Sequence, residues 1–397
     1  MESLAIVGGG IGGLASAILL SKKGYKVTIY DKAKSPQPVG AGFLLQPPGQ
    51  AVLHKLGILD KVLEQAVPIV GLQSKTLSGR SLLDLQYSRL KGSPRNGLGV
   101  QRSTIYQALL DEALSSSLVN MNWDSNVEEC ITKGDVVSVV CNETKVDYDL
   151  CVLSSGSNST MANKYFKDRI HRPYGWGCLW TTFELPGTLA PNILHQRCES
   201  SKKMMGILPV RKSGEKYEAA LYWSMKSADI EKLKRSDFPA LKNEIMQFWP
   251  DAKNSLEHLG FDDFIAASYN DNWIPKPFKG RIVAIGDISH ATSPQLGQGC
   301  TMALLDAWSL AKHLSKEDDS LESSLEEWWN TRKYQLSYVR QLSKFLTPLF
   351  QSESKLCEVF RDWLMAPVGR LPVFDNVQLK TLASDVLLRG ASIELEE

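Results

Sequence analysis

The sequence predicts an α/β protein of two parts, a layer of parallel strands and helices and a second, mainly antiparallel sheet, followed by C-terminal helices. Three observations support this prediction. Residues 4–31 follow the order strand, glycine-rich turn, helix and strand, which begins a parallel sheet. Residues 175–270 hold strand-like stretches with one helix near 239–249. From about residue 299 onward apolar residues recur at helical spacing, most regularly over 321–346.

The composition is that of a globular protein. Of the 397 residues, 43% are hydrophobic and 22% are charged, and 45 Lys and Arg nearly balance 44 Asp and Glu. A net charge of +1 provides no electrostatic reason to expect nucleic acid or an anionic membrane as a partner. No apolar run reaches the roughly 18 residues of a membrane-spanning helix, and no secretory leader is recognisable. The seven cysteines contain no C-x-x-C pair, so we expect reduced thiols, no metal site and a cytoplasmic location. We expect the protein to be a monomer or a homodimer.

The first functional signal is the turn Gly8–Gly13, which matches G-x-G-x-x-G between a predicted strand and a predicted helix. Gly8 would permit the tight turn, Gly10 would let the backbone approach a pyrophosphate, and Gly13 would allow close packing of helix on strand. The pyrophosphate would lie at the amino terminus of the helix. Asp31 ends the second strand, where it can bind a pair of ribose hydroxyls. This pattern predicts a dinucleotide-binding domain but does not separate NAD from FAD.

A second glycine-rich element follows the predicted strand at 281–285. Asp287 can hydrogen-bond a ribityl hydroxyl, and the backbone of Gly297–Gly299, at the start of a helix, can donate N–H groups to a flavin ring edge that becomes anionic on reduction. A nicotinamide dehydrogenase needs no such element, so the pair of motifs favours FAD. We expect His290 to be a structural histidine hydrogen-bonded in this turn, and Cys300 to be a packing residue whose backbone N–H matters more than its thiol.

Together these motifs resemble the class A flavoprotein monooxygenases, a family of aromatic hydroxylases. The resemblance covers about residues 4–160 and 275–345, and it also includes Val39–Gly42, Gln101–Arg102 and Gly156–Ser159. It implies a glutathione-reductase-like domain that holds non-covalent FAD in an extended pose, with NADPH or NADH as co-substrate.

The resemblance also implies roles for single residues. Arg102 would lie near the pyrophosphate and the ribityl chain, and Val127 would hold the adenine through its backbone. Ser155 stands where the family usually has an aspartate, which the family links to binding of FAD and of reduced nicotinamide. From motif and resemblance together, the predicted cofactor-binding residues are Gly8, Gly10, Ile11, Gly12, Gly13, Asp31, Lys32, Gly42, Leu44, Arg102, Val127, Ser155, Asp287, Gly297, Gln298, Gly299 and Cys300.

The activity implied by the resemblance is hydroxylation of a small aromatic or heteroaromatic substrate by NAD(P)H and O2 through a flavin C4a-hydroperoxide. Because the flavin would carry the chemistry, we predict no catalytic side chain. Alternation along a strand puts Tyr222 and Trp223 on opposite faces, so at most one of them lines the pocket. Two alternatives are a FAD-dependent dehydrogenase or reductase without oxygen transfer, and a non-catalytic flavin-binding protein. The predicted substrate pocket, between the flavin and the sheet at 175–225, comprises Gln46, Leu208, Arg211, Tyr222, Trp223 and Pro294.

The predicted domains alternate along the chain. The FAD-binding domain is expected in three segments, 1–71, 99–170 and 276–347. The substrate domain is expected in two, the strands of 72–98 and residues 171–275, and residues 348–397 are expected to form C-terminal helices.

Overall fold

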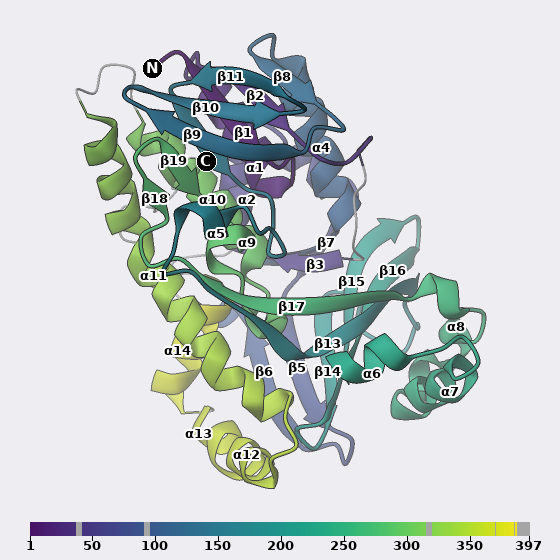
Figure 1. The fold of residues 1–397 in the computed structure, drawn as a ribbon. Helices are drawn as coiled ribbons and strands as arrows, with labels where there is room; N and C mark the ends of the chain where they lie inside the picture. Colours follow the sequence, from purple (N-terminus) through teal and green to yellow (C-terminus); the bar gives the residue numbers. More distant parts are fainter. Residues whose placement is uncertain (37–41, 91–95, 315–319, 370, 385, 387–397) are drawn as a thin grey trace.

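The computed structural model describes residues 1–36, 42–90, 96–314, 320–369, 371–384 and 386. Residues 39–41, part of one motif used above, lie outside this range. The fold is α/β with two main sheets and a helical C-terminal part, so the predicted fold class is confirmed (Figure 1).

The first sheet brings together strands from distant parts of the sequence. Its members are β1 (Ser3–Val7), β2 (Lys26–Tyr30), β8 (Val119–Asn122), β12 (Leu150–Leu153), β18 (Phe278–Lys279) and β19 (Ile282–Ala284). The order is β18-β19-β12-β1-β2-β8, and every neighbouring pair is parallel except β18 with β19. Because β1 and β19 are parallel, the two glycine-rich turns that follow them lie at the same edge of the sheet.

Layers on both faces bury this sheet. One face carries α1 (Ile11–Lys22), α2 (Pro47–Leu56), α4 (Arg102–Ser115), α10 (Gly299–His313) and the first half of α11 (Leu321–Phe350). The other face carries α5 (Ala162–Tyr165) and a small antiparallel sheet of β9 (Val127–Lys133), β10 (Val136–Cys141) and β11 (Thr144–Tyr148). Helix α1 is apolar on nearly all sides because it is enclosed by the sheet, α4 and α10.

The second sheet is mainly antiparallel, as predicted. It consists of β5 (Gly71–Thr76), β6 (Ser81–Gln86), β13 (Ile170–Glu184), β14 (Ile193–Glu199), β15 (Lys203–Ser213), β16 (Lys216–Lys226) and β17 (Ile265–Trp273). The order is β17-β13-β16-β15-β14-β5-β6, with one parallel pair, β14 and β5. A third sheet of β3 (Gly42–Leu45), β7 (Gly97–Gln101) and β4 (Val67–Ile69) connects the two parts.

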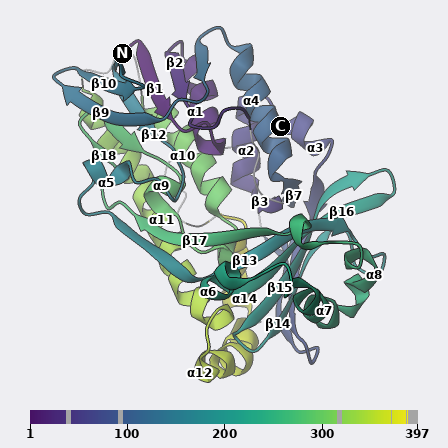
Figure 2. The same cartoon turned by 45° about the vertical axis from the view of Figure 1, so that its right-hand side comes forward.

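Different helices cover the two faces of the second sheet (Figure 2). One face packs against α6 (Ser227–Lys232), α7 (Phe238–Phe248) and α8 (Lys253–Leu256). The other face packs against the second half of α11, α12 (Lys355–Val359), the π-helical segment η5 (Phe360–Met365), α13 (Ala366–Gly369) and α14 (Pro372–Leu382). Helix α11 therefore spans both parts of the molecule (Figure 1).

The remaining short helices connect these elements. They are α3 (Leu59–Leu63), α9 (Asp287–His290), η1 (Tyr87–Arg89), η2 (Pro250–Ala252), η3 (Phe261–Asp263) and η4 (Pro294–Leu296). Over the described residues, no helix has both the length and the hydropathy that crossing a membrane requires.

Candidate cofactor and substrate site

A cavity of about 1340 Å³ runs through the junction of the two parts. Its lining begins at the turn between β1 and α1, passes the start of α10, and continues over β13, β15 and β16 to α14. The cavity thus joins the carboxyl edge of the parallel sheet, where dinucleotides bind in such folds, to one face of the second sheet.

The glycine turn after β1 forms one end of the cavity. Gly8 has φ +106°, a conformation that side chains disfavour, and its N–H donates to the Tyr30 carbonyl at 2.8 Å. A Cβ at Gly13 would lie 2.0 Å from the Gly8 carbonyl oxygen, whereas a Cβ at Gly10 would meet open space. The first N–H groups of α1 have no partner within the helix, and no side chain caps it. This end of the cavity can therefore bind an anionic group through the free backbone N–H groups at the start of α1.

Asp31 lies beside this turn and has a second task that the sequence did not reveal. Its Oδ2 accepts from the Gly9 N–H at 2.7 Å and its Oδ1 from the Ala33 N–H at 2.8 Å, while the residue also lines the cavity. A carboxylate has about four acceptor positions, so two remain for a ligand. Asp31 therefore stabilises the glycine turn and presents acceptors to the cavity at the same time.

We expect Asp31→Ala to weaken FAD binding by about 1.5–3 kcal/mol, the range for hydrogen bonds to a charged group. The expected loss combines the missing ribose acceptors with a loosened Gly9 turn. Titration of apoprotein with FAD, followed by flavin fluorescence, measures it. Asp31→Asn retains one acceptor oxygen and should lose less. Equal affinity in the parent protein and the alanine variant would contradict this role.

The second glycine-rich element forms the middle of the cavity. Asp287, Gly297, Gly299 and Cys300 line it, and no side chain caps α10. Burial raises the pKa of the Cys300 thiol to about 12, so the thiol stays protonated and packs as a neutral group, as expected. The side chain of Gln298 points away to α14, where its Nε2 donates to the carbonyls of Thr381 and Leu382 at 3.0 and 3.2 Å.

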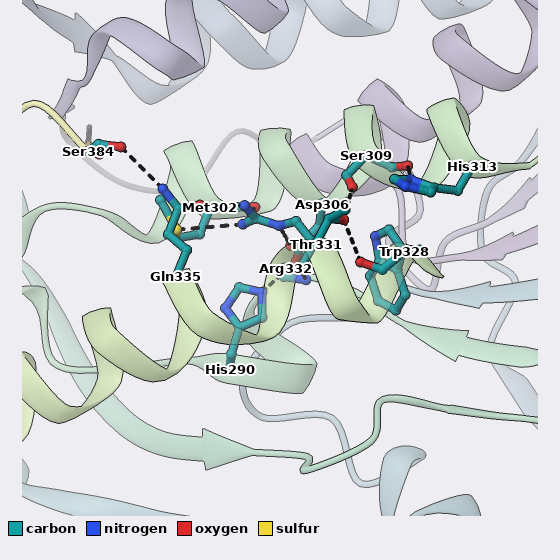
Figure 3. Close-up of polar contacts among 11 residues, drawn as sticks. His290, Met302, Asp306, Ser309, His313, Trp328, Thr331, Arg332, Gln335 and Ser384 are labelled. Atoms are coloured by element: carbon teal, nitrogen blue, oxygen red, sulfur yellow. Dashed lines mark hydrogen bonds and ion pairs between the residues drawn. The ribbon is translucent and has the colours of Figure 1, made fainter. Parts of the chain in front are cut away.

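A buried polar network holds this element in place (Figure 3). Asp306 of α10 accepts from the Gly286 N–H at 2.9 Å, interacts with His290 Nε2 at 2.5 Å, and pairs with Arg332 Nε of α11 at 2.9 Å. Burial alone would raise the pKa of Asp306, but His290, Arg332 and the Gly286 N–H together hold it at about 2. His290 is buried and outside the cavity lining, in keeping with the structural role predicted for it, but its side chain bonds to Asp306 of α10 and not within its own turn.

The network continues to the C-terminal part of the chain. Arg332 donates to Gln335, and Gln335 Nε2 donates to the Ser384 carbonyl at 3.2 Å (Figure 3). The Ser384 hydroxyl in turn donates to Gln298. The segment around Ser384 is thus tied both to the α10–α11 core and to the loop before α10. The sequence signal that could have revealed this network is Asp306, the one acidic residue of the otherwise largely apolar helix α10.

Most predicted cofactor-binding residues line the cavity. Gly13 does not, because it packs against the Gly8 carbonyl behind the turn. The Ser155 hydroxyl donates to the Ser159 hydroxyl at 2.8 Å. Those that line the cavity are Gly8, Gly10, Ile11, Gly12, Asp31, Lys32, Gly42, Leu44, Arg102, Val127, Ser155, Asp287, Gly297, Gln298, Gly299 and Cys300.

Of the residues predicted for the substrate pocket, Leu208, Tyr222 and Pro294 line the cavity, and the other three do not. Arg211 follows a register shift in β15 and is exposed, opposite Glu218. Trp223 faces the other side of the sheet, with its ring 5.1 Å from that of Phe248.

Gln46 is the third residue outside the lining. It is fully buried, and its side-chain oxygen accepts from the Tyr87 hydroxyl at 2.6 Å. The prediction therefore missed that Gln46, although polar, is a core residue whose side chain binds Tyr87. It also missed Trp180 and Tyr269, which line the cavity from β13 and β17. Their position depends on pairing between strands that are about 90 residues apart, and no local pattern signals it.

The amino termini of α1 and α10 both line this cavity, and the second sheet covers its far end. This arrangement is typical of a flavin-type dinucleotide-binding protein with a separate substrate face. The comparisons with known proteins agree. Residues 1–323 match the family described as "FAD binding domain", and the chain belongs to this family.

Relatives and solved structures extend this result. The chain is 26% identical to the putative FAD-dependent monooxygenase YetM of Bacillus subtilis (strain 168), over 86% of this chain and 92% of the relative. It is 27% identical to 2-heptyl-3-hydroxy-4(1H)-quinolone synthase of Pseudomonas aeruginosa (strain UCBPP-PA14), over 78% and 80%. The structure of Klebsiella pneumoniae HpxO complexed with FAD and uric acid has a TM-score of 0.80 at 19% identity, covering 96% of this chain and 97% of that one.

The predicted resemblance to class A flavoprotein monooxygenases is thereby confirmed, and the protein is a FAD-dependent oxidoreductase of the monooxygenase type. The residues present fit the cofactor. The uncapped starts of α1 and α10 offer backbone N–H groups, and Gly10 leaves the space that a side chain would fill.

Proposed function

We propose that this monooxygenase hydroxylates a small aromatic or heteroaromatic compound, with NADH or NADPH as reductant and O2 as oxidant. The observation that carries the proposal is the continuity of the cavity. Pro294 and Gly297, which precede α10, and Trp180 and Tyr222 of the second sheet all line this one cavity. A ring held there would lie next to the group bound at α10.

FAD, when bound, supplies the acceptor for hydride and the activation of oxygen. The protein's own task is to bind and orient. The starts of α1 and α10 would hold the two anionic or electron-rich ends of the cofactor, and Arg102 and Asp287 would hold its middle. Ser155 lacks the carboxylate that is usual at this position in the family, and it would bind the cofactor through its hydroxyl. The carboxylate of Asp306 stays ionised and keeps Gly286, and with it Asp287, in position.

The sheet face beyond Pro294 is suited to a flat ring. The rings of Trp180 and Tyr222 meet edge to face, with centroids 5.0 Å apart. Trp180 Nε1 donates to the Tyr269 hydroxyl at 3.2 Å, and Gln351 Nε2 donates to the Tyr222 hydroxyl at 2.7 Å. Burial raises the pKa of both phenols, so both remain neutral and can orient a polar group of the substrate without acting as a base. The apolar walls would limit the access of water to a ring bound there.

Two of the similar proteins support a ring substrate by name, since a quinolone and uric acid are both heteroaromatic.

Turnover of the FAD-loaded protein with a panel of ring compounds tests the proposal. The expected result is that some compound accelerates NAD(P)H oxidation and yields a product heavier by one oxygen atom, which mass spectrometry detects. NAD(P)H oxidation that yields only hydrogen peroxide with every compound would overturn it in favour of a reductase. A flavin that neither nucleotide bleaches, even with a ligand bound, would indicate a non-catalytic flavin protein.

We further propose that the protein acts in the cytoplasm as a monomer or homodimer. All seven cysteines are free, which suits a reducing compartment.

A further inference from the structure

Charged side chains line the cavity only along its cofactor-binding half, from the β1 turn to Asp287, as far as the described residues show. All of them belong to the dinucleotide-binding part or to the turn after β19, and none comes from the second sheet or from the C-terminal helices. These residues are Asp31, Lys32, Arg102, Glu128, Lys164 and Asp287. The chamber beyond Pro294 therefore offers a substrate no ionic partner.

The polar atoms in this chamber are neutral. Tyr222 and Tyr269 keep their phenol protons, and Gln196 carries no charge. Arg361 lies near the ring of Phe350, a lining residue, but is outside the lining and pairs with Asp362 at 2.7 Å. Moving a carboxylate or phosphate out of water into such surroundings is strongly unfavourable unless a partner compensates its charge. The chamber thus favours an uncharged ligand.

An apolar groove leads from the chamber to the surface along α14. The end of this helix is bound to the loop before α10 through Gln298. Toward the start of the helix, Val377 and Phe374 line the cavity and yet are 48% and 49% exposed, and Phe345 of α11 lines it at 54% exposure. From Leu382 to Phe374 the helix rises about 12 Å at 1.5 Å per residue. Exposed apolar residues that line a cavity mark an apolar mouth.

We propose that the substrate is an uncharged aromatic compound that carries an apolar tail. The ring would lie between Pro294 and the Trp180–Tyr222 pair, and the tail would follow α14 to the mouth at Val377 and Phe374. This inference rests on the proposed function, because it uses the same chamber, and it adds both the charge and the shape of the substrate.

Binding of para-n-alkylphenols and para-n-alkylanilines of increasing chain length tests the proposal. Perturbation of the absorbance of the oxidised flavin, without nucleotide, reports binding independently of turnover. Each methylene that enters the groove should lower Kd by up to about fourfold, the equivalent of about 0.8 kcal/mol. The gain should stop once the tail reaches the mouth. A carboxylate on the ring should abolish binding, whereas one at the end of a tail long enough to reach water should be tolerated.

Two variants of α14 provide the matched comparison. Val377→Asp places a carboxylate in the groove, so its cost should grow with chain length. Val373→Asp places the same charge on the same helix at a residue that is 72% exposed and outside the lining, so it should leave the chain-length series unchanged. FAD content and melting temperature verify that both variants fold.

No gain with chain length in either series, or acids that bind as tightly as neutral rings, would overturn the inference. Chain-length dependence that Val377→Asp leaves intact would place the tail elsewhere and also overturn it. The two proposals fail separately. Tailed compounds that bind as expected but yield no oxygenated product would refute the proposed function alone. Hydroxylation of small charged rings would refute only the uncharged, tailed substrate.

Discussion

Asp306→Ala is expected to lower the free energy of unfolding by about 3–5 kcal/mol, the range for removing one partner of a buried ion pair. Arg332 is fully buried and would lose its carboxylate partner, while the Gly286 N–H would lose its acceptor. Because Gly286 precedes Asp287, FAD content should fall as well. Urea denaturation of the apoprotein measures the stability, and absorbance measures the flavin.

A surface pair provides the control. Asp251 pairs with Arg197 at 3.2 Å with both side chains partly exposed, so Asp251→Ala should cost no more than about 1 kcal/mol. Similar losses in the two variants would show that the Asp306 network adds no more than an exposed pair does.

The same network predicts the pH dependence of stability. The pKa of Asp306 is lowered from 3.8 to about 2 in the folded state, which corresponds to about 2 kcal/mol. A lowered folded-state pKa means that the unfolded chain binds more protons in this range. The contribution is therefore complete above pH 3.8 and is lost as the pH falls through about 2. Asp306→Asn lacks a titrating group, so the stability difference between it and the parent should shrink by about this amount on acidification.

Gly10→Ala and Gly13→Ala should separate binding from folding within one turn. Gly10 has an extended backbone that alanine can adopt, and its Cβ would meet no protein atom within 4 Å. Gly10→Ala should therefore leave apoprotein stability nearly unchanged. It should weaken FAD binding by about 1–3 kcal/mol, the usual cost of overpacking, or about 5- to 150-fold in Kd.

Gly13→Ala should instead harm the apoprotein itself. Its Cβ would lie 2.0 Å from the Gly8 carbonyl oxygen and 2.6 Å from the Ser154 hydroxyl oxygen, so the turn would have to open. We expect a loss of about 1–3 kcal/mol in stability, together with loss of FAD. Thermal melts of both apoproteins and FAD titrations distinguish the two outcomes. Normal FAD affinity in Gly10→Ala would mean that the pyrophosphate lies elsewhere.

The cofactor half of the site could be predicted because its signals are local in the sequence. A glycine needed for a positive φ, as at Gly8, an acid at the end of a strand, as at Asp31, and a helix that starts after Gly297–Gln298 are each visible within a few residues. Sixteen predicted cofactor residues line the cavity. Gly13 lies just behind them, because this position of the motif allows the helix to pack closely on the strand.

The substrate half could not be predicted in the same way. Alternation correctly limited the pocket to one of Tyr222 and Trp223, but only the helices packed on each face decided that Tyr222 lines it. Arg211 does not line the cavity: it follows a register shift in β15 and is exposed, whereas Leu208 lies in the lining. The residues that line the chamber together with Tyr222 come from β13, β17, α11 and α14, and only strand pairing and chain reversal bring these elements together.

By itself, then, the sequence determined a FAD-dependent oxidoreductase of α/β fold, since backbone conformation and helix amino termini are specified by neighbouring residues. The tertiary structure decided which side chains surround the substrate, that none of those described is charged, and that Asp306, His290 and Arg332 form one network. The physical reason is that burial and charge compensation depend on residues distant in the chain, and their free energy is set by the whole packed environment rather than by any segment.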